Sequence, residues 1–68
     1  MKPNDELLLP AEAGEYLGGV PPTTLQWWRS VGRGPVFLKI GRKVAYRRSA
    51  LDHFLQRGER KPEAANAA

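Results

Sequence analysis

The apolar positions in the first third of the chain are spaced for a short helix. Ala13 and Leu17 lie four residues apart, so in a helix over 10–17 both side chains point to the same side. A proline suits the first turn of such a helix, and the two glycines that follow Leu17 are expected to end it. We expect the leucines at 7–9 to pack across this helix as a hydrophobic staple.

The next segment predicts a second short helix, which runs to about Val31. The Val-Pro-Pro link before it is expected to be extended, because a proline disfavours helical backbone at the residue before it. Thr23 or Thr24 then caps the helix. Leu25 and Trp28 lie three residues apart and form an apolar stripe that faces the first helix. Two short helices joined by Gly-Gly-Val-Pro give a helix-turn-helix pattern.

Alternating apolar positions then predict a two-stranded hairpin. Over 36–40 Val, Leu and Ile alternate with Phe and Lys, and the alternation resumes at Val44 and Tyr46. Gly41 supplies the turn between the strands. The tip of the hairpin would carry Arg42 and Lys43. A hairpin alone is marginally stable, so its apolar face must rest on the helices.

A third helix is predicted where Leu51 and Phe54 lie three residues apart. Ser49 and Asp52 resemble a capping box for its first turn, and Gly58 is expected to end it. The predicted order is therefore helix, turn, helix, two-stranded β wing and closing helix. This is the order of a small α+β winged helix-turn-helix domain.

The predicted elements define one domain and its core. We expect a winged helix-turn-helix DNA-binding domain over 7–57, a flexible N-terminus over 1–6 and a flexible or frayed tail over 58–68. The expected core residues are Leu17, Leu25, Trp28, Leu38, Tyr46, Leu51 and Phe54.

Length and composition exclude several classes of function. A chain of 68 residues has room for one small core and not for a deep catalytic cleft. It has no cysteine and a single histidine, His53, which excludes disulfides and thiolate metal sites. No apolar run approaches the roughly 20 residues that cross a bilayer, and the N-terminus lacks the features of a signal peptide. We therefore expect a cytoplasmic protein that is not an enzyme, has no membrane association and needs no cofactor or metal.

The charge is concentrated in the middle of the chain, although the net charge is only +4. Residues 20–48 hold seven basic residues and no acidic one, while residues 1–19 hold one base and four acids. Residues 49–68 hold three of each. Basic residues that only keep a surface soluble are usually mixed with acids, so this segment indicates a surface that binds a polyanion.

The outward face of the second helix is expected to enter the major groove of DNA, which is wide enough to admit a helix. The expected contacts of this recognition helix are Thr23, Thr24, Gln26, Trp27, Arg29, Ser30 and Arg33. The wing would reach the adjacent backbone or minor groove, where positive side chains are attracted. Its expected contacts are Arg42, Lys43 and Arg47.

Adjacent tryptophans cannot both lie in the core, because neighbouring side chains on a helix point about 100° apart. Trp28 belongs to the apolar stripe, which leaves Trp27 to be explained. Trp27 would stack on DNA sugars and thymine methyl groups, bind a neighbouring copy of the protein, or cover the edge of the core. The sequence leaves these three interpretations open.

Several short motifs in the order found here resemble one known family. "EYLG", "TLQWWRSVGRGP", "KIGRKVAYRR" and the helix near Leu51 resemble the excisionase-type, AlpA-like and MerR-like winged helix-turn-helix domains of phages and mobile elements. The resemblance implies a recombination directionality factor that acts in the bacterial host cell. Such a protein binds repeated sites on double-stranded DNA, bends the DNA, associates cooperatively with further copies and steers a phage integrase toward excision.

Two other functions are compatible with the same sequence. An AlpA-like transcriptional regulator would bind a single operator without an integrase. A protein-interaction module of a different class would use Trp27 and the basic segment to bind an acidic partner.

Overall fold

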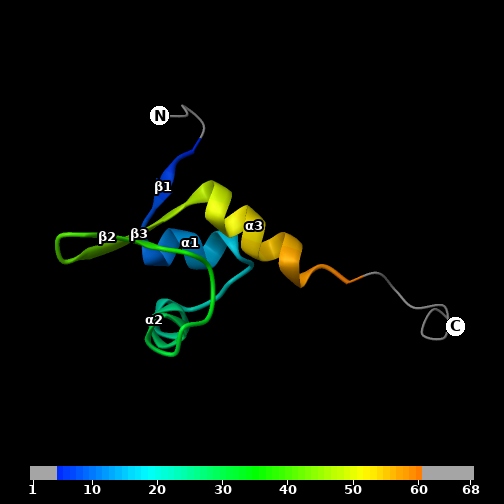
Figure 1. The fold of residues 1–68 in the computed structure, drawn as a ribbon, viewed down its shortest axis with the longest axis horizontal. Helices are drawn as coiled ribbons and strands as arrows, with labels where there is room; N and C mark the ends of the chain where they lie inside the picture. The colour runs from blue at the N-terminus through cyan, green and yellow to red at the C-terminus, as the bar shows by residue number, and fades with distance from the viewer. Residues whose placement is uncertain (1–4, 61–68) are drawn as a thin grey trace, which may run out of the picture.

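Three helices pack against a small antiparallel sheet in the computed structural model, which describes residues 5–60 (Figure 1). The elements are β1 (Leu7–Leu8), α1 (Pro10–Tyr16), α2 (Pro22–Ser30), β2 (Leu38–Ile40), β3 (Lys43–Arg47) and α3 (Arg48–Gly58). The predicted small α+β fold, with a helix-turn-helix, a hairpin and a closing helix, is confirmed. Within the described residues, no helix combines the length and the apolar composition needed to cross a membrane.

The sheet contains a strand that the sequence analysis did not predict. The leucines at 7 and 8 were expected to be part of a staple, but they form β1 and pair antiparallel with β3. Leu7 lies opposite Arg47, and Leu8 lies opposite Tyr46. Without β1, one edge of β3 would leave its backbone N–H and C=O groups without strand partners. The strand order β1-β3-β2 therefore makes β3 the central strand.

The hairpin is shorter than predicted, because β2 begins at Leu38 and Val36 is 73% exposed. The turn at Gly41 is as predicted, with a φ of 62° that favours glycine. The expected alternation fails in β3, where Ala45 and Tyr46 are both buried. Both α1 and α3 pack against this central strand, so burial is not confined to one of its faces.

Glycine allows the turn of the helix-turn-helix to close tightly. The N–H groups of Gly19 and Val20 both donate to the carbonyl oxygen of Gly14, each at 2.9 Å. A Cβ atom on Gly14 would lie 2.0 Å from the carbonyl oxygen of Val20, which is far inside van der Waals contact. The close approach of the turn to α1 therefore requires a residue without a side chain.

The start of α2 differs from the prediction. Neither Thr23 nor Thr24 caps the helix, because the N-cap is Pro21 and no side chain bonds there. Pro22 occupies the first helical position, where its fixed φ suits the helix and its missing N–H costs no hydrogen bond. The two threonines lie inside the first turn instead.

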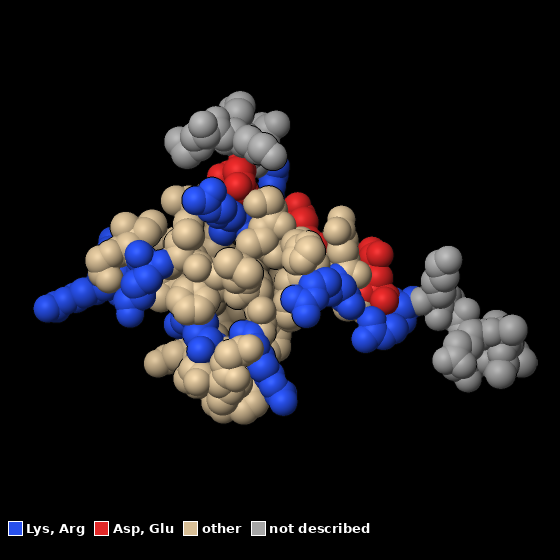
Figure 2. Space-filling model, viewed as in Figure 1, with Lys and Arg blue, Asp and Glu red and all other residues tan. Residues whose placement is uncertain are grey.

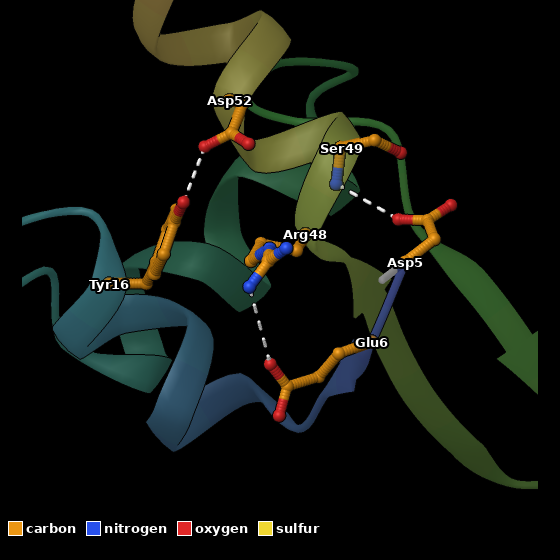
Figure 3. Close-up of polar contacts among 6 residues, drawn as sticks. All are labelled: Asp5, Glu6, Tyr16, Arg48, Ser49 and Asp52. Atoms are coloured by element: carbon orange, nitrogen blue, oxygen red, sulfur yellow. Dashed lines mark hydrogen bonds and ion pairs between the residues drawn. The ribbon is translucent and has the colours of Figure 1, made fainter. Parts of the chain in front are cut away.

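The first turn of α3 is held by the N-terminal segment and not by the predicted capping box of Ser49 and Asp52. The N–H of Arg48 donates to the carbonyl oxygen of Glu6 at 2.9 Å. The N–H of Ser49 donates to Oδ1 of Asp5 at 3.1 Å (Figure 3). Residues 1–6 were expected to be flexible, yet Asp5 and Glu6 contact α3. Residues 1–4 lie outside the described residues, and so do residues 61–68 of the expected tail.

Asp52 instead links α3 to α1. The Tyr16 hydroxyl donates a short hydrogen bond to Oδ1 of Asp52 (Figure 3). This bond raises the pKa of the Tyr16 hydroxyl above its ordinary value, because the carboxylate favours the protonated donor. The hydrogen bond therefore connects two helices at the surface of the domain.

The core lies between the helices and β3. Its buried side chains are Leu8, Ala13, Leu25, Tyr46 and Leu51. Of the remaining residues expected there, Leu17 and Trp28 are partly buried against this cluster, and Leu38 and Phe54 are half-buried. The rings of Trp28 and Phe54 contact each other with centroids 5.6 Å apart, which ties α2 to α3.

The close approach at Gly14 predicts the outcome of adding one methyl group. We expect Gly14→Ala to lower the free energy of unfolding by about 2 kcal/mol, because the turn must move away from α1. Gly58→Ala is the matched control, since its Cβ would meet open space at the end of α3. Denaturant unfolding measures both, and the interpretation fails if the two substitutions change stability equally.

Candidate nucleic-acid interface

One face of α2 is directed away from the core. Thr23, Gln26, Trp27 and Ser30 are exposed and lie at positions i, i+3, i+4 and i+7, which form one stripe along a helix. The opposite face carries Leu25, which is completely buried. The exposed stripe has hydroxyl and amide groups and one large aromatic ring, and these groups can contact base edges and sugars.

The two adjacent tryptophans have different environments. Trp28 is half-buried and packs against Phe54, and its ring also leaves no room for a Cβ atom at Gly34. Trp27 is 54% exposed on the outer face of α2. An indole exposed to this extent is not a core residue, and it is available for contact with a partner.

Two predicted contacts of α2 are less available than the sequence suggested. Thr24 is half-buried, so it lies beside the exposed stripe and not within it. The hydroxyl of Ser30 donates to the carbonyl oxygen of Trp27 at 2.7 Å, which leaves its oxygen as an acceptor.

Glycines end α2 and place Arg33 beside it. The N–H of Gly32 donates to the carbonyl oxygen of Arg29 at 3.4 Å, and the N–H of Arg33 donates to that of Trp28 at 2.7 Å. These two bonds and the φ of 74° at Gly32 are the features of a Schellman C-cap. Arg33 is exposed, so its charge lies at the C-terminal end of the α2 face.

Arg29 has a different orientation from the other predicted contacts. Its guanidinium donates to the hydroxyl of Tyr46 at 2.6 Å, and the residue is half-buried. It does not lie on the exposed stripe of α2.

The hairpin carries positive charge at its tip. Lys39, Arg42 and Lys43 are exposed, and Arg42 lies in the turn beside Gly41. Figure 2 shows basic side chains over the hairpin, at the left of the view, and around α2 below it. Within residues 5–60, neither these three nor Arg33 forms an ion pair with a carboxylate.

Arg47, the third predicted contact of the wing, has a different partner. Its Nη1 atom lies 3.7 Å from Oδ2 of Asp5, and that of Arg48 lies 3.9 Å from Oε1 of Glu6. The Arg47 side chain remains 51% exposed, so this pair is partly screened by water and stabilises the domain little. The acids of the N-terminal segment nevertheless lower the positive potential near the base of the hairpin.

Four exposed bases at the end of α2 and on the hairpin have no acidic partner among residues 5–60. We call this the basic surface; its residues are Arg33, Lys39, Arg42 and Lys43. The acidic side chains visible in Figure 2 lie toward the N-terminal strand and along α3, away from α2 and the hairpin tip. A separation of charge of this kind attracts and orients a polyanion.

The rest of the described surface holds little that could perform chemistry. Among residues 5–60 no three His, Cys, Asp or Glu side chains gather where a metal ion could bind. His53 is exposed on α3, at the edge of a groove lined by Pro35, Val36 and Phe54. Ser49 also lines the groove, one helical turn before His53, but among residues 5–60 no hydrogen bond joins their side chains, as a nucleophile and its base would require.

No curated protein and no solved structure matches the chain. A family model, described as a helix-turn-helix domain, matches residues 7–59, which include every helix and strand described above. A helix-turn-helix domain implies DNA binding, and such domains are typically not enzymes. The matched region and the geometry of α1, the turn and α2 agree, and the chain belongs to the helix-turn-helix domain family.

Proposed function

We propose that this protein is a DNA-binding and DNA-bending excisionase, a recombination directionality factor that acts on repeated sites in the DNA of a bacterial host. The observation that carries the proposal is the combination of the exposed face of α2 with the bases of the hairpin tip, which have no ion pair among residues 5–60. These two elements give a domain two separate points of contact with one duplex.

The exposed face of α2 reads the major groove in this proposal. Gln26 can bond an adenine through two hydrogen bonds, and Thr23 can donate to or accept from either kind of base pair. Arg33 would contact a guanine or a phosphate at the end of the helix. Thr24 contributes less because it is half-buried. Ser30 contributes less because its hydroxyl already donates to the carbonyl oxygen of Trp27.

The hairpin provides the second contact. Arg42 and Lys43 at the tip would contact phosphates or enter the narrow minor groove beside the site of α2. Arg47 would join them only after releasing Asp5. Two contacts at different places favour a bent duplex, because bending brings more of the backbone against the basic surface.

The excisionase role rests on the sequence motifs, which resemble excisionase-type domains of phages and mobile elements. In that role, copies bind adjacent repeats cooperatively and direct a phage integrase toward excision. A transcriptional regulator with the same fold would use the same surface on a single operator. The DNA-binding unit is proposed to span 7–57, and its action on DNA places it in the cytoplasm of the host.

The proposed contact with phosphates predicts the salt dependence of binding. Four phosphates neutralised by the basic surface give a slope of log K against log salt of about −3.6. Changing Arg42 and Lys43 together to alanine is expected to reduce the slope to about −1.8 and to weaken binding on all sequences alike. A gel-shift titration over a range of salt, on repeated sites and on scrambled DNA, measures both values.

The same titration distinguishes the proposed functions. Ladders of cooperative, bent complexes on repeated sites support the excisionase. A single unbent complex on one operator would indicate a regulator. No salt-dependent binding at all would contradict the DNA-binding proposal and favour an acidic protein partner.

The exposure of Trp27 predicts that its loss affects binding more than folding. We expect Trp27→Ala to change the free energy of unfolding by less than about 0.5 kcal/mol. We expect it to weaken DNA binding about tenfold, because the indole no longer covers sugars and thymine methyl groups. Leu55→Ala is the control, since Leu55 is an exposed apolar residue of α3. A large fall in the melting temperature of Trp27→Ala would instead show that the indole supports the core.

A further inference from the structure

Arg29 connects α2 to the sheet through its side chain. Its Nη1 atom donates a hydrogen bond to the hydroxyl of Tyr46 at 2.6 Å. Its guanidinium also lies over the ring of Phe37, with the Cζ atom 5.7 Å from the ring centroid. The rings of Phe37 and Tyr46 contact each other, with centroids 6.4 Å apart. One side chain of α2 therefore contacts both the segment that leads into β2 and the central strand β3.

Tyr46 makes this contact a fixed one, because its side chain is completely buried. A buried phenol needs a hydrogen-bond partner, and a bond from a guanidinium is stronger than one from a neutral donor. The ring of Phe37 attracts the same guanidinium through a cation–π contact. Arg29 is itself half-buried, which reduces the competition from water for these contacts.

The elements themselves provide few direct contacts between α2 and the hairpin. α2 packs mainly on α1, and α1 packs in turn on β3. Figure 1 shows α2 and the hairpin as separate parts of the domain, joined by the segment over 31–37. Their relative position therefore depends on the side chains that bridge them.

We propose that Arg29 is a positioning residue, which holds the hairpin relative to α2 so that both reach one DNA duplex at the same time. The inference rests on the proposed function, in which α2 and the hairpin tip both contact DNA. A fixed link reduces the ordering that the second contact requires and makes that contact intramolecular. Arg29 then acts through Tyr46 and Phe37, whereas the sequence analysis expected it to contact DNA itself.

A double-mutant cycle tests this link without changing the charge of the bridge. Tyr46→Phe removes the acceptor of the Arg29 hydrogen bond and keeps the buried ring. We expect it to weaken binding to repeated sites about fivefold and to leave the salt slope unchanged. In the Tyr46→Phe background, changing Arg42 and Lys43 to alanine is expected to cost about fivefold less affinity than in the wild-type protein.

A pair of arginine variants provides the control and a second test. Arg29→Gln and Arg33→Gln each remove one positive charge from α2 or its C-terminal end, but Arg33 is exposed and has no contact with Tyr46. We expect Arg33→Gln to reduce the salt slope by about 0.9. In this background, changing Arg42 and Lys43 to alanine is expected to lower DNA affinity by the same factor as in the wild-type protein. We expect Arg29→Gln to reduce that cost, as Tyr46→Phe does.

Circular dichroism and a thermal melt establish that each variant is folded. The proposal is overturned if the hairpin-tip change costs as much affinity in folded Tyr46→Phe as in the wild-type protein. If Tyr46→Phe does not fold, equal costs in the Arg29→Gln and Arg33→Gln backgrounds overturn it. The absence of salt-dependent binding by the wild-type protein overturns the proposed function itself, so the two failures are distinguishable.

Discussion

The pairing of β3 on both of its edges is the constraint on which the rest of the domain depends. β1 covers one edge, β2 covers the other, and α1 and α3 pack against the strand. Tyr46, in this strand, is completely buried and directs its hydroxyl to Arg29 of α2. A chain of this length can bury only a small core, so one strand that contacts most other elements stabilises the whole fold.

The same arrangement separates the charges. Asp5 and Glu6 precede β1, and the pairing of β1 with β3 brings them to Arg47, Arg48 and the first turn of α3. Their charges are therefore partly neutralised within the domain. The basic surface over the end of α2 and the hairpin has no acidic partner among residues 5–60. The acids of the N-terminal segment therefore make contacts within the domain, whereas the bases of this surface do not pair with them. The acids hold the first turn of α3 in place, and the bases remain exposed, as the proposed contact with DNA requires.

Local signals in the sequence predicted most of the fold, and distant contacts account for what was missed. Glycines at 18, 32 and 41 and the apolar spacing on each helix are local features, and the helices and the turn of the hairpin follow from them. β1 has two residues, which is too short to show an alternating pattern. The cap of α3 joins Ser49 to Asp5, 44 residues away, so no capping motif near the helix could reveal it.

The candidate site was predicted to a similar degree. Helical spacing alone places Gln26 and Trp27 on one exposed face, and the charge pattern indicates the hairpin tip. The orientation of Arg29 was not predictable, because it depends on Tyr46 and Phe37, which become its neighbours only in the folded domain. Spacing along a helix shows which side a residue occupies but does not show which partner a long side chain finds.

The most direct test of the account is a nuclear magnetic resonance titration of the ¹⁵N-labelled protein with a duplex that carries the repeated sites. The account predicts that the largest shifts occur at the Trp27 indole, at the amides of the exposed α2 face and at those of Arg42 and Lys43. The outer face of α1, with Glu12 and Glu15, would remain unchanged. Shifts concentrated on α1 or α3, or no shifts at physiological salt, would contradict the claim that α2 and the hairpin form the DNA-binding surface.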